Sequence, residues 1–358
     1  MTVSRLERIQ SLLRDHDLDA LLVTHPPNIR YLTGLQASAG AAVIVRDRCV
    51  LVVDSRYATS ARAIADKTSS VEVEVSSGHL DPAIVKVLSR VGARSTGVEA
   101  EHLPVGRFNR LQSGVTAGVL VPIERAVERL RVVKDEGEIA IFREAGRRIS
   151  AVARRLREFA QVGWTELEVA AAIDAAMRTA GFERAAFETI VASGPNGALP
   201  HARPTDRKLR DGDGVVLDFG GVYDGYCVDL TRTLQLGSVP AGFRRMFEAV
   251  REAQAAAIAA VRPGARATDI DGAARRALEA HGLGEAFGHG TGHGLGLEVH
   301  EEPRLSPLAP ADAVVSAGMV FTIEPGAYVP GLGGVRIEDD VLVVSGGCEL
   351  LTDVPAQL

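Results

Sequence analysis

The hydrophobic positions in the first third of the chain form short β-branched or apolar runs that alternate with helical patterns. Near the start, apolar residues every three or four positions predict an amphipathic helix, and Ser4 and Glu7 have the spacing of a capping box. Such alternation is typical of α/β domains, so we expect one over residues 1–125. The expected strands are 19–24, 41–45, 50–53 and 70–75, and the expected helices between them are 57–66 and 82–91.

From residue 126 the pattern changes to two pairs of helices, each followed by strands. Asp135 with Glu138, and Thr165 with Glu168, have the spacing of capping boxes at helix starts. Each helix pair leads into a glycine-rich segment with histidine and then into an antiparallel sheet, so region 126–358 is predicted to contain two related halves of α+β type. The expected helices are 139–160, 165–181, 243–261 and 269–281.

A short pattern of glycine, five residues, a carboxylate, one residue and a second glycine occurs twice in this region. The first copy is Gly212, Asp218 and Gly220, and the second is Gly318, Glu324 and Gly326. In each copy an apolar run leads into the acid, and a second acid follows at Asp229 and at Glu338. Burying four carboxylates beside apolar strands is costly unless a cation lies among them, so the pattern predicts a metal site.

The first pair of acids can be placed by the geometry of a hairpin. Asp224-Gly225 favours a two-residue turn, which sets Asp218 opposite Thr231. Asp229 lies two positions from Thr231 and therefore on the same face of the sheet. We expect Asp218 and Asp229 within reach of a common ion, with the Thr231 hydroxyl positioned to support a ligand.

The histidines concentrate between the two acid pairs, in a run from Phe287 to Arg304 that contains His289, His293 and His300. Glycines at alternate positions let the backbone of this run pass close to a metal or a substrate. One imidazole with four carboxylates favours Mn²⁺, Co²⁺ or Zn²⁺ over copper, and four acids exceed what one divalent ion needs. Two ions are therefore expected, and hydrolysis of an acyl bond is the reaction class that such a pair supports.

Other function classes lack their sequence signals. The chain has no G-x-S-x-G elbow, no P-loop and no dinucleotide fingerprint after a strand. A net charge of −6 without a basic block argues against nucleic acid, and no apolar run approaches the roughly 20 residues of a membrane span. Three cysteines without C-x-x-C spacing fit reduced thiols, so a cytoplasmic protein is expected.

Several motifs resemble those of the pita-bread metallopeptidases, and specifically of the Xaa-Pro peptidases, which comprise Xaa-Pro dipeptidase (prolidase) and aminopeptidase P. The likeness spans nearly the whole chain. It implies an α+β pita-bread catalytic domain with internal duplication over residues 126–358, preceded by a creatinase-like α/β domain over residues 1–125. The segments that carry the resemblance are 28–34 (NIRYLTG), 193–201 (SGPNGALPH), 217–232 (LDFGGVYDGYCVDLTR), 289–296 (HGTGHGLG), 321–326 (FTIEPG) and 335–340 (VRIEDD).

The resemblance also implies a role for individual residues. Its metal ligands are Asp218, Asp229, His293, Glu324 and Glu338, which would hold two divalent ions, Mn²⁺ being preferred over Co²⁺ or Zn²⁺. Glu324 would also carry a proton from the attacking water to the leaving nitrogen. His201 and His300 would contact the substrate and stabilise the oxyanion, and His289 would line a proline pocket. Arg304 would bind the free carboxylate of a dipeptide, and Arg336 would orient the ligands.

The implied activity is hydrolysis of the N-terminal Xaa-Pro bond in dipeptides or short peptides. Arg304 favours a dipeptidase, whereas the compact N-terminal domain also suits an aminopeptidase P that acts on longer peptides. A peptide-binding module on the same fold is the non-enzymatic alternative, although such relatives lack ligands that are present here. The resemblance further implies a homodimer, in which the loop 35–40 would reach the active site of the partner.

Overall fold

A computed structural model describes residues 5–357, so the Ser4 cap lies outside the described residues. The chain forms two compact units that divide between Arg131 and Val132, rather than after residue 125. The short helix α6 (Glu128–Arg131) accounts for the difference because it bonds to the first unit. The Tyr31 hydroxyl donates to the Leu130 carbonyl at 2.7 Å, and Arg131 donates to the Asn28 side chain at 2.6 Å.

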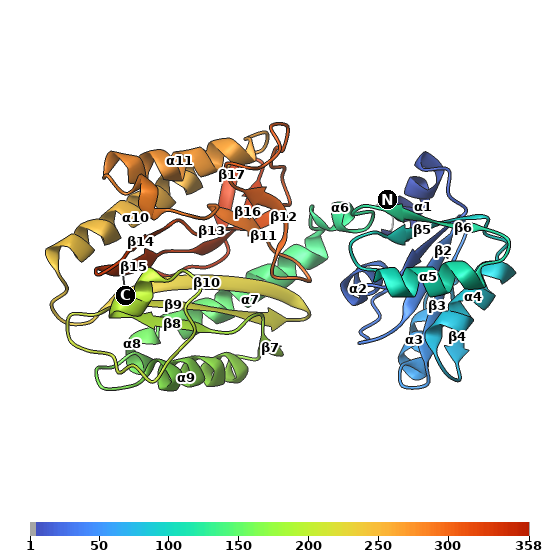
Figure 1. Cartoon of the computed structure of the whole chain (residues 1–358), viewed down its shortest axis with the longest axis horizontal. Coiled ribbons are helices and arrows are strands. Elements are labelled where there is room, and N and C mark those ends of the chain that lie inside the picture. Colours follow the sequence, from blue (N-terminus) through green and yellow to red (C-terminus); the bar gives the residue numbers. More distant parts are fainter. Residues whose placement is uncertain (1–4, 358) are drawn as a thin grey trace. The chain divides into compact units, whose positions relative to one another are not determined.

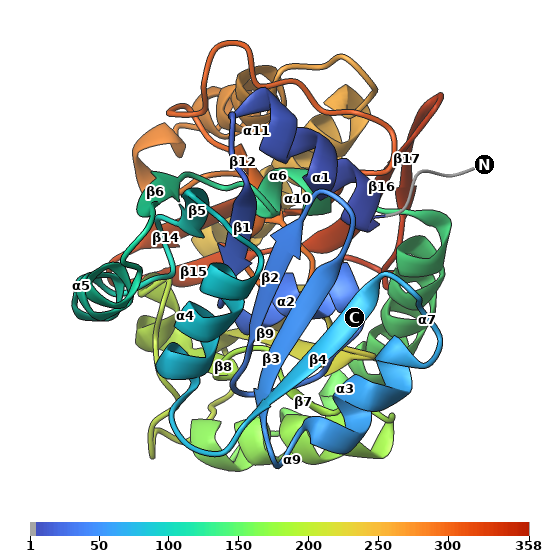
Figure 2. The ribbon, with the colours of Figure 1, turned by 90° about the vertical axis from the view of Figure 1, so that its right-hand side faces the viewer.

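The first unit is a six-stranded sheet with helices against it (Figure 2). The strand order is β4-β3-β2-β1-β5-β6, in which β2 runs antiparallel to both neighbours and the other pairs are parallel. Ile84 and Leu88 of α4 and Leu111 of α5 belong to the apolar core that these strands form. The elements are α1 (Arg5–Asp15), β1 (Ala20–Val23), α2 (Pro26–Thr33), β2 (Ala41–Val45), β3 (Cys49–Asp54), α3 (Ala58–Ala65), β4 (Val71–Ser76), α4 (Leu80–Arg90), β5 (Ser95–Glu99), α5 (Val105–Gly114) and β6 (Val119–Ile123). The strands and helices expected for this region are confirmed.

The helices of the second unit flank its strands on two sides, α7 and α9 on one and α10 and α11 on the other (Figure 1). Both capping boxes are confirmed: Asp135 accepts from the Glu138 amide at 3.0 Å, and Thr165 accepts from the Glu168 amide at 3.1 Å. The single helix expected over residues 139–160 is broken between α7 and α8. The helices are α7 (Glu136–Ala153), α8 (Leu156–Phe159), α9 (Glu166–Thr179), α10 (Ala241–Ala260) and α11 (Ala267–Ala280).

The two halves of the second unit have related strand arrangements that differ in how the strands pair. The first half pairs β9 with β10, and β7 and β8 both pair with β9. The second half has a sheet of order β12-β11-β13-β16-β17 and a separate hairpin of β14 and β15. The strands are β7 (Arg184–Ala185), β8 (Ile190–Ser193), β9 (Gly214–Tyr223), β10 (Tyr226–Gln235), β11 (Gly292–Gly294), β12 (Glu301–Leu305), β13 (Val320–Ile323), β14 (Gly326–Val329), β15 (Gly333–Arg336), β16 (Asp339–Val344) and β17 (Gly347–Leu350).

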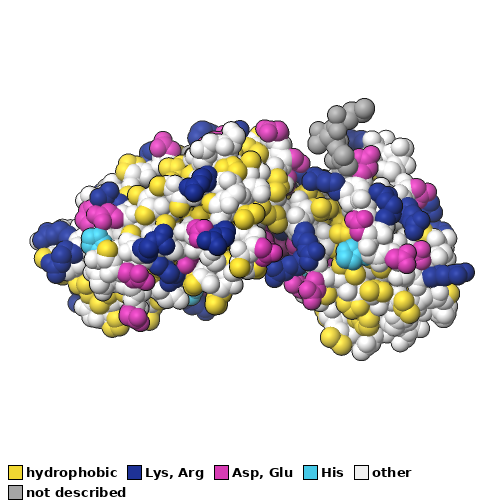
Figure 3. All heavy atoms as spheres, turned by 90° about the horizontal axis from the view of Figure 1, so that it is seen from above, with side chains coloured by type: hydrophobic (Ala, Val, Ile, Leu, Met, Phe, Trp, Pro, Cys, Tyr) yellow, Lys and Arg dark blue, Asp and Glu magenta, His cyan; other side chains and the backbone are white. Residues whose placement is uncertain are grey.

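A large apolar core fixes the second half of this unit. Phe243 and Phe247 of α10 and Ile270 of α11 are buried with Phe321 of β13 in one cluster. The outer face over these helices, in the left part of Figure 3, intersperses basic and acidic side chains. Within residues 5–357, no helix combines the length and the apolar character that a bilayer span requires.

The cap of α9 can be tested because the single tryptophan of the chain, Trp164, precedes it. We expect Thr165→Ala to lower the free energy of unfolding by about 1 kcal/mol, since the Glu168 amide loses its acceptor. Thr165→Ser keeps the hydroxyl and should remain near the wild type. Urea unfolding followed by Trp164 fluorescence measures both, and an unchanged Thr165→Ala midpoint would contradict the assignment of the cap.

Candidate active site

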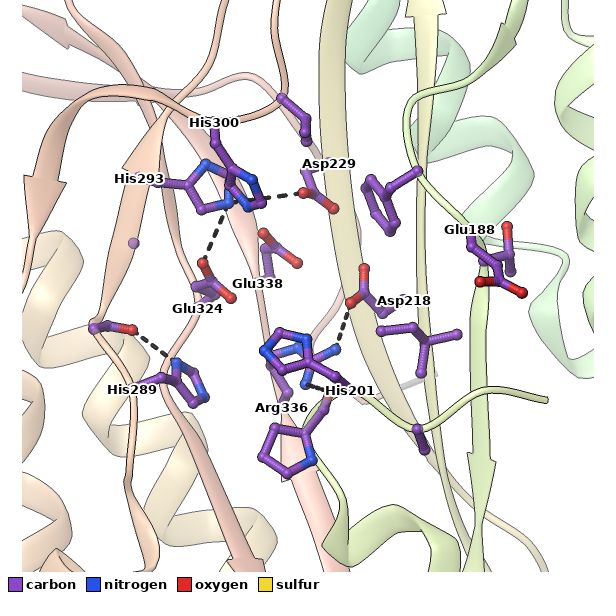
Figure 4. A pocket seen from close by; sticks show the side chains of 18 of the residues that line it. Glu188, His201, Asp218, Asp229, His289, His293, His300, Glu324, Arg336 and Glu338 are labelled. Atoms are coloured by element: carbon purple, nitrogen blue, oxygen red, sulfur yellow. Dashed lines mark hydrogen bonds and ion pairs between the residues drawn. The ribbon is translucent and has the colours of Figure 1, made fainter. Parts of the chain in front are cut away.

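The first pair of acids lies on the continuous hairpin of β9 and β10. Asp224 and Gly225 have φ values of 43° and 76°, which are the left-handed conformations of the expected two-residue turn. The register sets Asp218 opposite Thr231, as predicted, and Asp229 opposite Gly220. Asp218 and Asp229 consequently project into one pocket (Figure 4).

The second pair of acids lies where the corresponding hairpin is interrupted. Ile323 pairs with Asp339 and Gly326 pairs with Arg336, so Glu324 and Glu338 fall between two separate ladders. Pro325 follows Glu324 and has no N–H to continue a ladder. The Glu338 amide instead donates to the Thr231 carbonyl of the first hairpin at 3.1 Å, which joins the two halves at the site.

These side chains converge with His293 in a cavity of about 600 Å³ (Figure 4). Oxygen or nitrogen atoms of Asp229, His293 and Glu338 all lie within 4.8 Å of one another, and the three residues are buried. His293 Nε2 is 3.4 Å from Glu324 Oε1 and 4.0 Å from Asp229 Oδ2. Asp218 lines the same cavity, so the five candidate ligands are brought together.

The electrostatics of this cluster fit a bound cation. In the described part of the chain, Asp218 Oδ1, Asp229 Oδ1 and Glu338 Oε1 are buried without a hydrogen-bond partner. Burial and the neighbouring carboxylates raise the pKa values of Asp229 and Glu338 well above their usual range, and burial raises the pKa of Glu324. Burial also lowers the pKa of His293 to about 4, which leaves the imidazole neutral, as a metal ligand must be.

Thr231 and Arg336 form hydrogen bonds with the acids. Thr231 Oγ1 donates to Glu338 Oε2 at 2.5 Å and accepts from Arg336 Nε at 3.2 Å. The same guanidinium donates from Nη2 to Asp218 Oδ2. Each of these acids therefore has one oxygen held by a hydrogen bond and one left for the cavity.

Tyr328 is a residue of the site that the sequence interpretation missed. Its hydroxyl accepts from Arg336 Nη1 at 2.8 Å and lies 2.9 Å from His289 Nε2. The only signal in the sequence was the i, i+2 spacing of Gly326 and Tyr328, which sets both on one face of a strand. In the structure, a Cβ at Gly326 would lie 2.5 Å from the Tyr328 hydroxyl. Glycine at 326 thus leaves room for the tyrosine.

His289 has both ring nitrogens in contact with the protein. Nδ1 is 2.8 Å from the Gly290 carbonyl and must be its donor, so Nε2 accepts the Tyr328 proton. Burial lowers the pKa of His289, in agreement with this neutral tautomer. The ring is therefore fixed in orientation and lines the cavity.

Asp339, Asp340 and Arg232 form a second group that the sequence interpretation missed, and these residues bond to the strands that carry the acids. Asp340 Oδ2 accepts from the Asp229 amide at 3.1 Å, and Asp339 Oδ1 accepts from Arg232 Nη2 at 2.7 Å. Arg232 is 0% exposed and also donates to the Val354 carbonyl at 2.6 Å. No local pattern predicts these contacts, because they join β10 to β16 and to the C-terminal segment, which lie more than a hundred positions later in the chain.

The outer wall of the cavity contains His201, His300 and Arg304. The His300 ring stands at 77° to the His293 ring with centroids 4.4 Å apart, and desolvation lowers its pKa to about 4. The carbonyl of Pro200, next to His201, accepts from Arg336 Nη1 at 3.3 Å. Within residues 5–357, the exposed Arg304 guanidinium has no ion-pair partner. Of the eleven site residues proposed from the sequence, ten line this cavity, and the eleventh, Thr231, bonds to two of them.

Comparison with known protein families identifies the family of this chain. Residues 140–345 match metallopeptidase family M24, and residues 5–133 match the creatinase/prolidase N-terminal domain. The chain belongs to metallopeptidase family M24. It is an enzyme of the pita-bread fold, as expected.

Members of the family resemble the chain over its whole length. The Xaa-Pro dipeptidase of Pyrococcus horikoshii is 34% identical, covering 99% of this chain and 98% of the relative. The solved Xaa-Pro dipeptidase from Bacillus anthracis is 33% identical with a TM-score of 0.94, covering 99% of this chain and 98% of that one. The X-Pro aminopeptidase from Thermotoga maritima is also 33% identical, with a TM-score of 0.88, covering 98% of this chain and 100% of that one.

The support given by Thr231 predicts an effect on metal affinity. We expect Thr231→Val to weaken Mn²⁺ binding by roughly 10- to 100-fold, because both Glu338 and Arg336 lose a hydrogen-bond partner. Thr231→Ser retains the hydroxyl and should bind Mn²⁺ like the wild type. Titration of the metal-free protein by calorimetry compares the three proteins. Equal affinities for the valine and serine variants would show that the hydroxyl does not support the site.

Proposed function

We propose that this metallopeptidase is an Xaa-Pro dipeptidase that hydrolyses the bond between an N-terminal residue and proline. The observation that carries the proposal is the convergence of His293 with the partly buried Glu324 and three buried carboxylates in one cavity. In the described part of the chain, each of the three buried acids has one buried oxygen without a hydrogen-bond partner. The relatives that are dipeptidases match over nearly the full chain. Membership of an enzyme family with every candidate ligand in place disfavours the peptide-binding module.

Two divalent ions fit the donor set, and we propose Mn²⁺ in preference to Co²⁺ or Zn²⁺. When bound, such ions supply a water of lowered pKa and polarise the scissile carbonyl. The residues that would hold them are Asp218, Asp229, His293, Glu324 and Glu338. Asp229, His293 and Glu338 each offer one atom within 4.8 Å of the others, so these three could share one ion.

The chain's own residues supply the remaining functions. Glu324 takes a proton from the attacking water and delivers it to the proline nitrogen, a role open to a carboxylate that lines the same cavity as the candidate ligands. His201 and His300, on the outer wall, donate to the oxygen that becomes negative in the transition state. His289 lines the space for the proline ring.

Replacing Glu324 by Gln tests the proton transfer. We expect kcat on Ala-Pro with Mn²⁺ to fall by at least about 10²-fold, because an amide cannot accept the proton. Since Glu324 is also a proposed ligand, the Mn²⁺ content of the variant must be measured alongside. Turnover retained at wild-type level would exclude this role for Glu324.

Arg304 tests the preference for dipeptides. We expect Arg304→Gln to raise KM for Ala-Pro by roughly 10- to 100-fold, the value of one or two hydrogen bonds to a charged carboxylate. The matched control is Ala-Pro amide, which has no carboxylate and should be cleaved equally by both proteins. An equal change on both substrates would contradict the carboxylate role.

An aminopeptidase that acts on longer peptides is the second candidate, supported by the likeness to the Thermotoga maritima enzyme. Turnover of Ala-Pro against Ala-Pro-Ala separates the two functions. A cytoplasmic homodimer with the loop 35–40 at the partner's active site remains our expectation for the assembled enzyme. A strictly monomeric active protein would refute the dimer.

A further inference from the structure

His289 lies in the glycine-rich segment 287–293, which has few side chains that could pack against the rest of the protein. Glycines occupy positions 288, 290 and 292, and glycine loses more conformational freedom on folding than any other residue. Two of these glycines are required by close contacts, because a Cβ would lie 1.9 Å from the Thr322 carbonyl at Gly292 and 2.8 Å from the Leu305 carbonyl at Gly290. The segment therefore depends on its neighbours for rigidity.

Helix α11 supplies that support through Arg275. Its Nη1 donates to the Phe287 carbonyl at 3.1 Å, and its Nη2 donates to the His289 carbonyl. The guanidinium carbon also lies 4.3 Å from the centre of the Phe287 ring. That ring meets the His289 ring edge-on, with centroids 5.0 Å apart and an angle of 85° between the planes. Arg275 thus fixes both the backbone of His289 and the side chain beside it.

Asp271, one turn earlier on α11, orients the guanidinium of Arg275 and forms further hydrogen bonds to the segment that carries His289. It is 1% exposed and accepts from Arg275 Nε at 2.6 Å. It also accepts from the amide of Thr291 at 3.1 Å and from its hydroxyl at 2.9 Å. Arg275 and Asp271 together therefore bond to this segment at Phe287, His289 and Thr291.

The metal-binding part of the run is anchored separately. His293 lies in β11, and its amide donates to Thr322 Oγ1 at 3.1 Å. β11 is paired on both sides, with β12 and with β13. Loss of Arg275 should consequently loosen His289 while leaving His293 in place.

We propose that Arg275 is a positioning residue for substrate selection, which acts with Asp271 to hold His289 as the wall against the substrate's second residue. The inference rests on the proposed Xaa-Pro activity and adds the source of its proline preference. Lysine cannot replace the arginine fully because one ammonium group lacks the planar fork that serves two carbonyls and Asp271 together.

The experiment compares Arg275→Gln, Arg275→Lys and the control Arg276→Gln, whose residue is exposed on the same helix. The readouts are kcat and KM on Ala-Pro and Ala-Ala, with Mn²⁺ affinity and thermal melting measured in parallel. For Arg275→Gln we expect the Ala-Pro to Ala-Ala ratio of kcat/KM to fall by about tenfold, mainly through KM for Ala-Pro. The lysine variant should be intermediate, and the control should match the wild type in every readout.

Each other outcome has a defined meaning. Equal losses on both dipeptides, an unchanged ratio, or a fall in Mn²⁺ affinity would overturn the positioning role, since the arginine would then serve general stability or the ligands. If Arg275→Gln does not fold, the lysine variant decides by the same ratio. A wild-type protein that fails to cleave Ala-Pro would refute the proposed function itself, and the inference with it.

Discussion

The structure depends on the confinement of four carboxylates in one cavity. Asp218, Asp229, Glu324 and Glu338 converge there, and Arg336 is the basic side chain that bonds to Asp218. A buried ion that lacks a counter-charge costs several kcal/mol, so the folded arrangement is favourable only when cations join it or protons neutralise it. The raised pKa values of Asp229 and Glu338 express the same conflict in the absence of a cation.

The two related halves meet this constraint in different ways. The first half presents its aspartates from an unbroken hairpin, whereas the second presents its glutamates from a break between two ladders. The bond from the Glu338 amide to the Thr231 carbonyl crosses from one half to the other and joins the two hairpins at the site. Arg336 extends this coupling outward through Tyr328 to His289. The proposed ligands Asp218 and Glu338 are therefore connected to His289, the proposed substrate wall, by one network of hydrogen bonds.

The sequence was sufficient for features governed by local chemistry. The Asp224-Gly225 turn fixed the register of Asp218 and Thr231, and the two capping boxes fixed the starts of α7 and α9. Features that depend on distant contacts were not predictable in this way. Arg232 bonds to a segment more than a hundred positions later, and the role of Asp339 follows from that return of the chain. The bonds from Arg275 to the Phe287 and His289 carbonyls likewise depend on how separate elements pack.

The central claim is that the two halves together form one metal centre from five side chains. Anomalous diffraction from crystals of the protein loaded with Mn²⁺ tests it most directly. The account predicts two manganese peaks in the cavity, in contact with Asp218, Asp229, His293, Glu324 and Glu338. A cavity without anomalous density under saturating Mn²⁺, or ions bound only at other acidic residues, would contradict it.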